Sequence, residues 1–289
     1  MEPRKIYKIT RPGVRMTCAE PLPRPVAERW LHEHGDWTSL QQAQGAERAP
    51  APHILAVPLE TGDAMIKTEH VPFVRSLRYA LCGRPARAHQ AFRLGLALAS
   101  RGVRSTLPLA LIEHRQQGLV RRSFLVLETI HASTLREFLL ARLGALDGAE
   151  HPGFKAAVWR ALGDEVAKLH AASFRQRDLK SPNILAGLAE DGSVRVHLID
   201  LEGMSPLRGP PVERVRVRDL ARLVVSLRQR DLAAAGVDAD DRRELIVRYL
   251  ESARGAPAEP SEVARVVAQT ERWARRKERR NRRRGRPLL

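Results

Sequence analysis

The spacing of apolar residues changes near residue 130, and this change restricts the folds that the chain can adopt. Before it, the pattern predicts a short helix over 26–34, a helix over 86–101 and strands over 54–59, 64–68, 107–113 and 123–128. After it, longer runs predict short strands at 184–186 and 194–199 and helices over 135–146, 154–172, 218–232, 240–252 and 261–283. Because the strands come first and the helices second, the pattern indicates an α+β fold with two lobes rather than an alternating α/β fold.

Composition and pattern together divide the chain into four segments. Residues 1–36 form a proline-containing prelude, 37–129 a strand-rich N-lobe, 130–264 a helical C-lobe and 265–289 an arginine-rich helix or tail. Apolar residues make up 43% of the 289 residues, which is enough for a substantial core and excludes wholesale disorder.

Membrane-spanning and exported proteins are not expected from this sequence. No stretch approaches eighteen uncharged apolar residues, and the first residues contain no apolar signal core. Cys18 and Cys82 are too few for a disulfide scaffold and lack the spacing of a metal site, which fits a reducing cytosol.

Positive charge is concentrated near the C-terminus. The net charge is +17, and residues 265–286 contain eleven basic and two acidic side chains, so +9 lies in this segment and +8 elsewhere. Such a field favours a polyanion: nucleic acid, an anionic membrane or a phosphorylated glycolipid. The segment alone fits a solvated helix end, membrane attraction or non-specific nucleic-acid binding. Aromatic residues are only 4%, which argues against stacking platforms for single-stranded nucleic acid.

The most informative stretch follows the predicted helix over 154–172. Asp178 and Asn183 lie five residues apart with Lys180 between them, and Asp200 ends an apolar run twenty-two residues after Asp178. Phosphoryl transfer from ATP needs such a set: a carboxylate for the acceptor hydroxyl, an amide and a second carboxylate for magnesium, and a lysine for the moving charge. Singly, each residue has an ordinary explanation as a turn, cap or strand end; together they indicate this chemistry.

Four segments resemble motifs of the protein-kinase superfamily. Arg177-Asp178-Leu179-Lys180-x-x-Asn183 is similar to the catalytic loop, and Asp200-Leu201-Glu202-Gly203 is similar to the magnesium-binding segment. Ala64-Met65-Ile66-Lys67 resembles the strand with the phosphate-binding lysine, and 124–130 resembles the strand that enters the hinge. The resemblance implies a two-lobed kinase-like fold, with Lys67 on the α- and β-phosphates of ATP and backbone groups of Glu128 and Ile130 on the adenine.

Within the superfamily, the sequence resembles the lipopolysaccharide core kinases, the Kdo/heptose kinase group. Three segments carry this resemblance: 102–109, Ile199-Asp200-Leu201-Glu202, and 218–227, which reads Arg-Asp-Leu-Ala-Arg-Leu-x-x-Ser-Leu. It implies magnesium-dependent transfer of the ATP γ-phosphate to a sugar hydroxyl of the lipopolysaccharide inner core, Kdo or heptose. It also implies a cytoplasmic enzyme peripheral to the inner membrane, whose arginine-rich tail contacts the anionic surface; specific nucleic-acid binding is not expected.

The resemblance to these kinases also implies a role for each of the four polar residues named above. Asp178 is the base or the residue that orients the hydroxyl, and Lys180 stabilises charge on the transferred phosphoryl group. Asn183 and Asp200 bind magnesium.

The sequence departs from the superfamily pattern at three places. Gln176 stands where the catalytic loop usually has histidine, and no glycine-rich loop precedes Lys67. No Asp or Glu occurs between Glu69 and Glu113, so the helix that usually supplies an acid partner for the lysine lacks one, with Gln90 its expected occupant. Two alternatives therefore stay open: a pseudokinase docked on membrane or RNA, and a Ser/Thr protein kinase, although no Ala-Pro-Glu-like segment follows Asp200.

Overall fold

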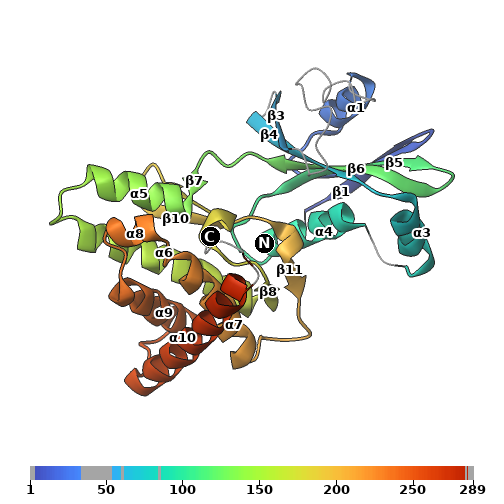
Figure 1. Ribbon diagram of the computed structural model, residues 1–289. Coiled ribbons are helices and arrows are strands. Elements are labelled where there is room, and N and C mark those ends of the chain that lie inside the picture. The colour runs from blue at the N-terminus through green and yellow to red at the C-terminus, as the bar shows by residue number, and fades with distance from the viewer. Residues whose placement is uncertain (1–3, 34–53, 60–61, 84–85, 284, 286–289) are drawn as a thin grey trace. The chain divides into compact units, whose positions relative to one another are not determined.

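The computed structural model describes residues 4–33, 54–59, 62–83, 86–283 and 285 (Figure 1). Two compact units make up the chain: unit 1 is Met1–Ser100 with Thr106–Thr129, and unit 2 is Arg101–Ser105 with Ile130–Leu289. Within the described ranges, no helix combines the length and apolar character that crossing a bilayer requires.

Unit 1 is built on a six-stranded antiparallel sheet in the order β1-β2-β5-β6-β4-β3. Its strands are β1 (Ile6–Arg11), β2 (Val14–Ala19), β3 (Ile54–Leu59), β4 (Gly62–His70), β5 (Pro108–Gln116) and β6 (Leu119–Glu128). The predicted strands are confirmed, whereas β1 and β2 were not expected. They extend the sheet beyond β5, where Met16 pairs with Ile112 in the register.

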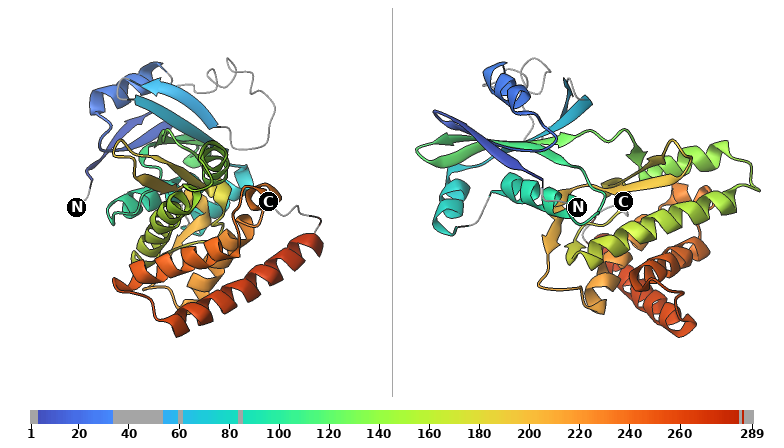
Figure 2. Two further views of the ribbon diagram at one scale, coloured as in Figure 1. Left: turned by 90° about the vertical axis from the view of Figure 1, so that its left-hand side faces the viewer. Right: turned by 180° about the vertical axis from the view of Figure 1, so that it is seen from behind.

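Helices cover both faces of this sheet. They are α1 (Arg24–Glu33), α3 (Phe73–Leu81) and α4 (Arg87–Ala99), with α1 on one face and α3 and α4 on the other (Figures 1 and 2). Buried residues of the sheet and of α1 share one apolar cluster, among them Met16, Trp30, Ile66 and Phe124. Burial of each such side chain stabilises the fold by about 1.5–3 kcal/mol.

Unit 2 is mostly helical, with short strands that hold its loops. Its helices are α5 (Leu135–Ala145), α6 (His151–Ala171), α7 (Glu213–Ser226), α8 (Arg230–Ala234), α9 (Ala239–Arg254) and α10 (Pro260–Arg283). Its strands are β7 (Ser133–Thr134), β8 (Phe174–Gln176), β9 (Ile184–Leu188), β10 (Val194–Leu198) and β11 (Met204–Pro206). They form two small sheets, β10-β9-β7 and β11-β8. A strand-rich first part and a helical second part confirm the predicted α+β class.

Local chemistry explains why the helices of unit 2 begin and pack where they do. Thr134 and Glu137 form a capping box at the start of α5, and Asp238 with Asp241 does the same for α9. Helices α6 and α9 cross closely at Gly163, where a Cβ atom would lie 2.7 Å from the backbone nitrogen of Tyr249. Only a residue without a side chain permits this approach.

The arginine-rich segment is a packed helix. In Figure 2, α10 runs alongside α7 and α9. Ala274 is fully buried against Ala221 and Val224 of α7, and the guanidinium of Arg218 lies 4.4 Å from the ring centroid of Trp273. The basic charge near the C-terminus is therefore fixed to the body of unit 2.

A short segment of unit 2 interrupts unit 1 in the sequence. The backbone N–H of Arg104 donates to the buried carboxylate of Glu165 on α6, and the Arg104 carbonyl accepts from the N–H of Leu198 at 2.9 Å. Ser105 forms a β-bridge with Leu198. These bonds tie Arg101–Ser105 to α6 and β10.

Candidate active site

Asp178, Lys180 and Asn183 lie together in the loop between β8 and β9. The ammonium Nζ of Lys180 is 2.9 Å from Oδ2 of Asp178, whose carboxylate is 42% exposed. The amide Nδ2 of Asn183 donates to the backbone oxygen of Asp178 at 2.9 Å and to Oδ2 at 3.1 Å. One carboxylate oxygen is thus fixed by a lysine and an amide, while the group as a whole stays accessible. This arrangement suits a base that receives a proton from a bound hydroxyl.

Gln176 joins this loop to the segment that follows β10. Its side-chain Nε2 donates to the carbonyl of Asp200 at 3.1 Å, and its Oε1 accepts from the backbone N–H of Asp178 at 3.1 Å. Gly203 makes room for it, since a Cβ at that position would lie 2.3 Å from Oε1 of Gln176. In the sequence, Gln176 stood only as a departure from the usual histidine. In the structure, it binds both loops that carry predicted site residues.

Asp219 on α7 is fully buried and binds the backbone just before the loop that carries Asp178. One of its oxygens accepts from the backbone N–H of Gln176 at 3.0 Å, and the other from the Arg222 guanidinium at 2.8 Å. Arg175 and His170 lie within 3.6 Å of the same carboxylate. A buried carboxylate with several partners fixes the backbone before Asp178.

Asn183 and Asp200 are brought together by the pairing of β9 with β10. Ile184 pairs with Leu198, and beyond them the N–H of Ile199 donates to the carbonyl of Asn183 at 3.0 Å. Asp200 has φ 62° and ψ 65°, in the left-handed region that non-glycine residues rarely adopt. Such a backbone is a strained state of the kind that clusters at functional sites.

These two residues fit a magnesium ion chemically. Both supply oxygen ligands, which Mg²⁺ prefers, and the ion usually takes only one or two protein groups beside phosphate oxygens. The bonds of Asn183 to Asp178 use its nitrogen, so its Oδ1 has no donor among the described residues. In the described part of the chain, no three Asp, Glu, His or Cys side chains gather closely enough to hold a metal ion by themselves.

The predicted nucleotide-binding residues are distributed over both units. Lys67 lies half-buried on β4, where it pairs with Leu125 of β6. Glu128 ends β6, and its backbone N–H already donates to the carbonyl of Leu107 at 2.9 Å. Ile130 is in unit 2, where its carbonyl accepts from Ala132. Contact of Lys67, Glu128 and Ile130 with ATP stays a prediction.

Helix α4 contains no carboxylate, as the sequence indicated, and Gln90 is exposed on it. A carboxylate reaches this helix from β4: Oε2 of Glu69 accepts from the backbone N–H of Ala88 at 3.3 Å, in the first turn of α4. The segment before Lys67 that lacks a glycine-rich loop, 41–46, lies outside the described residues.

Lys277 on α10 is a neighbour of the loop that sequence reasoning missed. Burial lowers its pKa, as do the cations Arg222 and Lys180, while Asp178 opposes this shift. Lys277 is thus electrostatically coupled to both ends of the Asp178–Lys180 pair. Apolar spacing at Val263, Val266 and Ala274 was the signal that α10 packs, because these residues form its buried face.

Comparisons with known proteins agree with this description. A family model described as the lipopolysaccharide kinase (Kdo/WaaP) family matches residues 65–249, more than half of the chain. Among solved structures, one described as WaaP in complex with acyl carrier protein is similar with a TM-score of 0.59 and 20% identity. The matched region covers 90% of this chain and 97% of the WaaP chain. The BubR1 kinase domain gives a TM-score of 0.40 and 12% identity over 70% of this chain and 51% of that one. No curated protein matches significantly. The similarity to WaaP confirms the predicted protein-kinase-like fold.

Proposed function

Because the chain belongs to the lipopolysaccharide kinase (Kdo/WaaP) family, whose members are phosphotransferases, we propose that it phosphorylates a Kdo or heptose hydroxyl of the lipopolysaccharide inner core. The donor in this proposal is ATP with magnesium. The observation that carries it is the bonded set of Asp178, Lys180 and Asn183, with Asp200 held beside it through Gln176. The set supplies a base, a cation and oxygen ligands at one place, as phosphoryl transfer requires.

Each group in the set has a defined task. The acceptor oxygen forms a bond to the γ-phosphorus, the bond from that phosphorus to the bridging oxygen of ADP breaks, and the hydroxyl proton passes to Asp178. The ion pair with Lys180 places positive charge beside Asp178 and the transferred group. Asn183 Oδ1 and Asp200 would hold magnesium, which neutralises phosphate charge, and Lys67 would hold the α- and β-phosphates.

The positive charge on the exposed face of α10 supports the proposal that the enzyme acts at an anionic membrane surface. All three acidic residues of this helix are paired with arginines outside it: Glu262 with Arg254, and Glu271 and Glu278 with Arg228. Arg265 of this helix pairs with Glu213. The other arginines of α10 are exposed and have no carboxylate partner among the described residues; they are Arg272, Arg275, Arg276, Arg279, Arg280, Arg282 and Arg283. Each basic residue near an anionic surface contributes about 1 kcal/mol, so the enzyme is proposed to be peripheral to the cytoplasmic side of the inner membrane.

Phosphate transfer from labelled ATP tests the proposal. The parental protein and Asp178→Asn are each given Kdo-bearing lipid A, the same glycolipid extended by heptose, and a protein mixture. We expect label in one of the glycolipids and a loss of at least about a hundredfold in the variant, since a positioned base contributes that much. Asp191→Asn is the matched control: it changes an exposed turn carboxylate that accepts from Ser193, and should transfer phosphate at the parental rate.

The other outcomes separate the alternatives. Label in proteins alone would mean a protein kinase. A folded sample that binds ATP but transfers phosphate to neither class of acceptor would mean a pseudokinase. An Asp178→Asn variant as active as the parent would remove the assignment of the base.

A further inference from the structure

Helix α3 presents its apolar residues to solvent. Phe73, Val74, Leu77 and Leu81 are 50%, 77%, 39% and 78% exposed, whereas Ser76 on the other side is buried. At 3.6 residues per turn, these four apolar positions fall within an arc of about 100°. A helix that packs on a sheet normally turns such an arc toward the core, so α3 has the reverse orientation.

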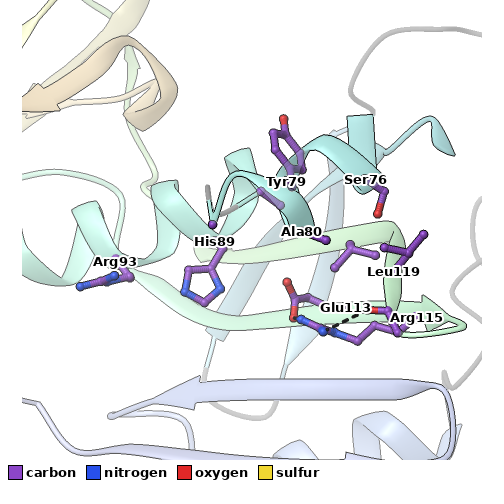
Figure 3. Close-up of a pocket in the computed structure, with 12 residues that line it drawn as sticks. Ser76, Tyr79, Ala80, His89, Arg93, Glu113, Arg115 and Leu119 are labelled. Carbon is purple, nitrogen blue, oxygen red and sulfur yellow. Dashed lines mark hydrogen bonds and ion pairs between the residues drawn. The ribbon is translucent and has the colours of Figure 1, made fainter. Parts of the chain in front are cut away.

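The inner side of α3 explains this reversal. It covers a cavity of about 320 Å³ whose wall includes polar groups (Figure 3). Ser76 points into this space from α3, His89 borders it from α4, and the ion pair of Glu113 with Arg115, 2.8 Å apart, lies on β5. Because polar side chains occupy the inner side, the apolar arc is not what holds α3 on the sheet.

The charges around the arc are of one sign. Residues 70–83, which include α3, contain Arg75 and Arg78 and no Asp or Glu. Arg75 and Arg78 are exposed on α3 beside the arc, and the guanidinium of Arg121 on β6 lies 5.5 Å from the ring centroid of Phe73. An apolar stripe bordered by arginines is complementary to a bilayer that has anionic headgroups over hydrocarbon.

We propose that α3 is a membrane-inserting element, in which Phe73, Val74, Leu77 and Leu81 enter the interface of an anionic bilayer. Arg75 and Arg78 then lie at the level of the headgroups. This contact is separate from the electrostatic one proposed for α10, and it does not depend on phosphate transfer. The two contacts can be distinguished because salt screens exposed arginines but does not weaken apolar burial.

Sedimentation of the full-length protein with vesicles tests the proposal. Vesicles of phosphatidylcholine alone are compared with vesicles that also contain phosphatidylglycerol, at low salt and at about 0.5 M salt. We expect the parent to stay bound to the anionic vesicles at high salt. The Leu77→Gln/Leu81→Gln variant, which keeps good helix formers, should bind them at least about tenfold more weakly.

A matched variant controls for the loss of exposed apolar groups as such. Leu188→Gln/Val212→Gln removes two apolar side chains of unit 2 that are 46% and 68% exposed, so it should bind like the parent. Phosphate transfer to a water-soluble sugar acceptor should be the same in the parent and in the α3 variant. Failure of the proposed function would abolish this activity in both and leave vesicle binding unchanged.

A label on Cys82 can report how deeply α3 enters the bilayer, because Cys82 is exposed directly after this helix. Cys18, in contrast, is fully buried, and burial raises the pKa of its thiol to about 12, so only Cys82 reacts readily. A fluorophore on Cys82 should be quenched by brominated lipid in the parent and not in the Leu77→Gln/Leu81→Gln variant.

Three outcomes would overturn the proposal. The first is equal high-salt binding by the parent and the α3 variant, and the second is a Cys82 label that brominated lipid does not quench. The third is a dimer, measured by sedimentation velocity, that the α3 variant loses while vesicle binding is unaffected. That result would assign the apolar arc to a second copy of the chain.

Discussion

The two units differ in how many carboxylates they bury. Of the four carboxylates that are buried in the described part of the chain, Glu165, Asp219 and Asp241 lie in unit 2 and only Glu113 lies in unit 1. In unit 2 each accepts hydrogen bonds from elements distant in sequence; Asp241, for example, binds Lys155 and Trp159 at 2.9 Å. Unit 1 instead contains the acid-free stretch 70–100, whose described arginines, Arg75, Arg78, Arg87 and Arg93, are exposed. Buried carboxylates thus join distant elements of unit 2, and Asp219 among them fixes the loop that carries Asp178, whereas the unbalanced charge of unit 1 is exposed.

The largest effect should follow from removing the central carboxylate of unit 2. Asp219→Ala leaves the half-buried Arg222 guanidinium and the buried backbone N–H of Gln176 without their acceptor, so we expect the free energy of unfolding to fall by about 3–5 kcal/mol. Urea denaturation followed by circular dichroism measures it. Glu213→Ala, which removes a surface pair with Arg265, should cost less than about 1 kcal/mol. Equal losses in the two variants would refute the contrast between buried and exposed carboxylates.

A double-mutant cycle tests the bridge between the two site loops. Gln176→Ala removes the hydrogen bonds to Asp200 and Asp178, and Gly203→Ala displaces the same side chain. Each should lower kcat by about ten- to a hundredfold, and the double variant should be no slower than the slower single one. Steady-state phosphate transfer is the measurement. Gly209→Ala is the control, since a Cβ there meets no atom within 4 Å. Independent, multiplying effects would mean that Gly203 acts through something other than Gln176.

The pH dependence of stability separates a buried acid from an exposed one. Burial raises the pKa of Glu165 above its ordinary value of 4.5, so the folded state binds this proton more tightly. The resulting stability is present at pH values below 4.5 and is lost as the pH rises through the folded-state pKa. Glu165→Gln removes this dependence, and its unfolding free energy should therefore rise relative to the parent as the pH increases from 4.5 through the folded-state pKa of Glu165.

Glu137 provides the matched control with the opposite sign. Hydrogen bonds from Thr134 lower the pKa of the exposed Glu137 carboxylate. The contribution of this group to the free energy of unfolding is therefore present above pH 4.5 and is lost as the pH falls through the folded-state pKa. Glu137→Gln should accordingly lose stability relative to the parent as the pH rises from below the folded-state pKa of Glu137 to about 4.5 and should differ by a constant amount above it. Parallel slopes for the Glu165→Gln and Glu137→Gln variants in urea denaturation at a series of pH values would contradict both assignments.

The smallest effect should come from adding an acid to unit 1. Gln90→Glu places a carboxylate in the first turns of α4, where the helix dipole favours it by about 0.3–1 kcal/mol. If Gln90 occupies the place of the missing acid, the KM for ATP should also fall a few-fold, with Gln90→Ala as the control. An unchanged KM would show that Gln90 does not occupy the place of the missing acid.

Periodicity alone predicted most helices of unit 2, since their buried faces repeat every three or four residues. The helix expected over 135–146, for example, is α5, Leu135–Ala145. Strand β1 escaped prediction because it is mostly exposed, with Ile6 at 54%, so burial imposes no alternation on it. Helix α3 escaped because its apolar residues point outward.

Motif spacing predicted the loop around Asp178 because Lys180 and Asn183, which bind it, are close in sequence. It could not predict the role of Gln176, whose bond to Asp200 spans twenty-four residues and depends on the pairing of β8 with β11. The position of Lys277 depends likewise on packing between helices distant in sequence.

The anchoring of Arg101–Ser105 has a consequence for the order in which the protein can fold during synthesis. The ribosome releases these residues before it has added Glu165, sixty-one positions after Arg104, or Leu198, which comes later still. Domains generally fold as they emerge, but a nascent chain that ends at Thr129 contains every strand of the larger sheet and none of the anchors for this segment. The segment Arg101–Ser105 therefore takes up its final structure only after Leu198 has been made, and the gene encodes unit 1 in two pieces that these five residues separate.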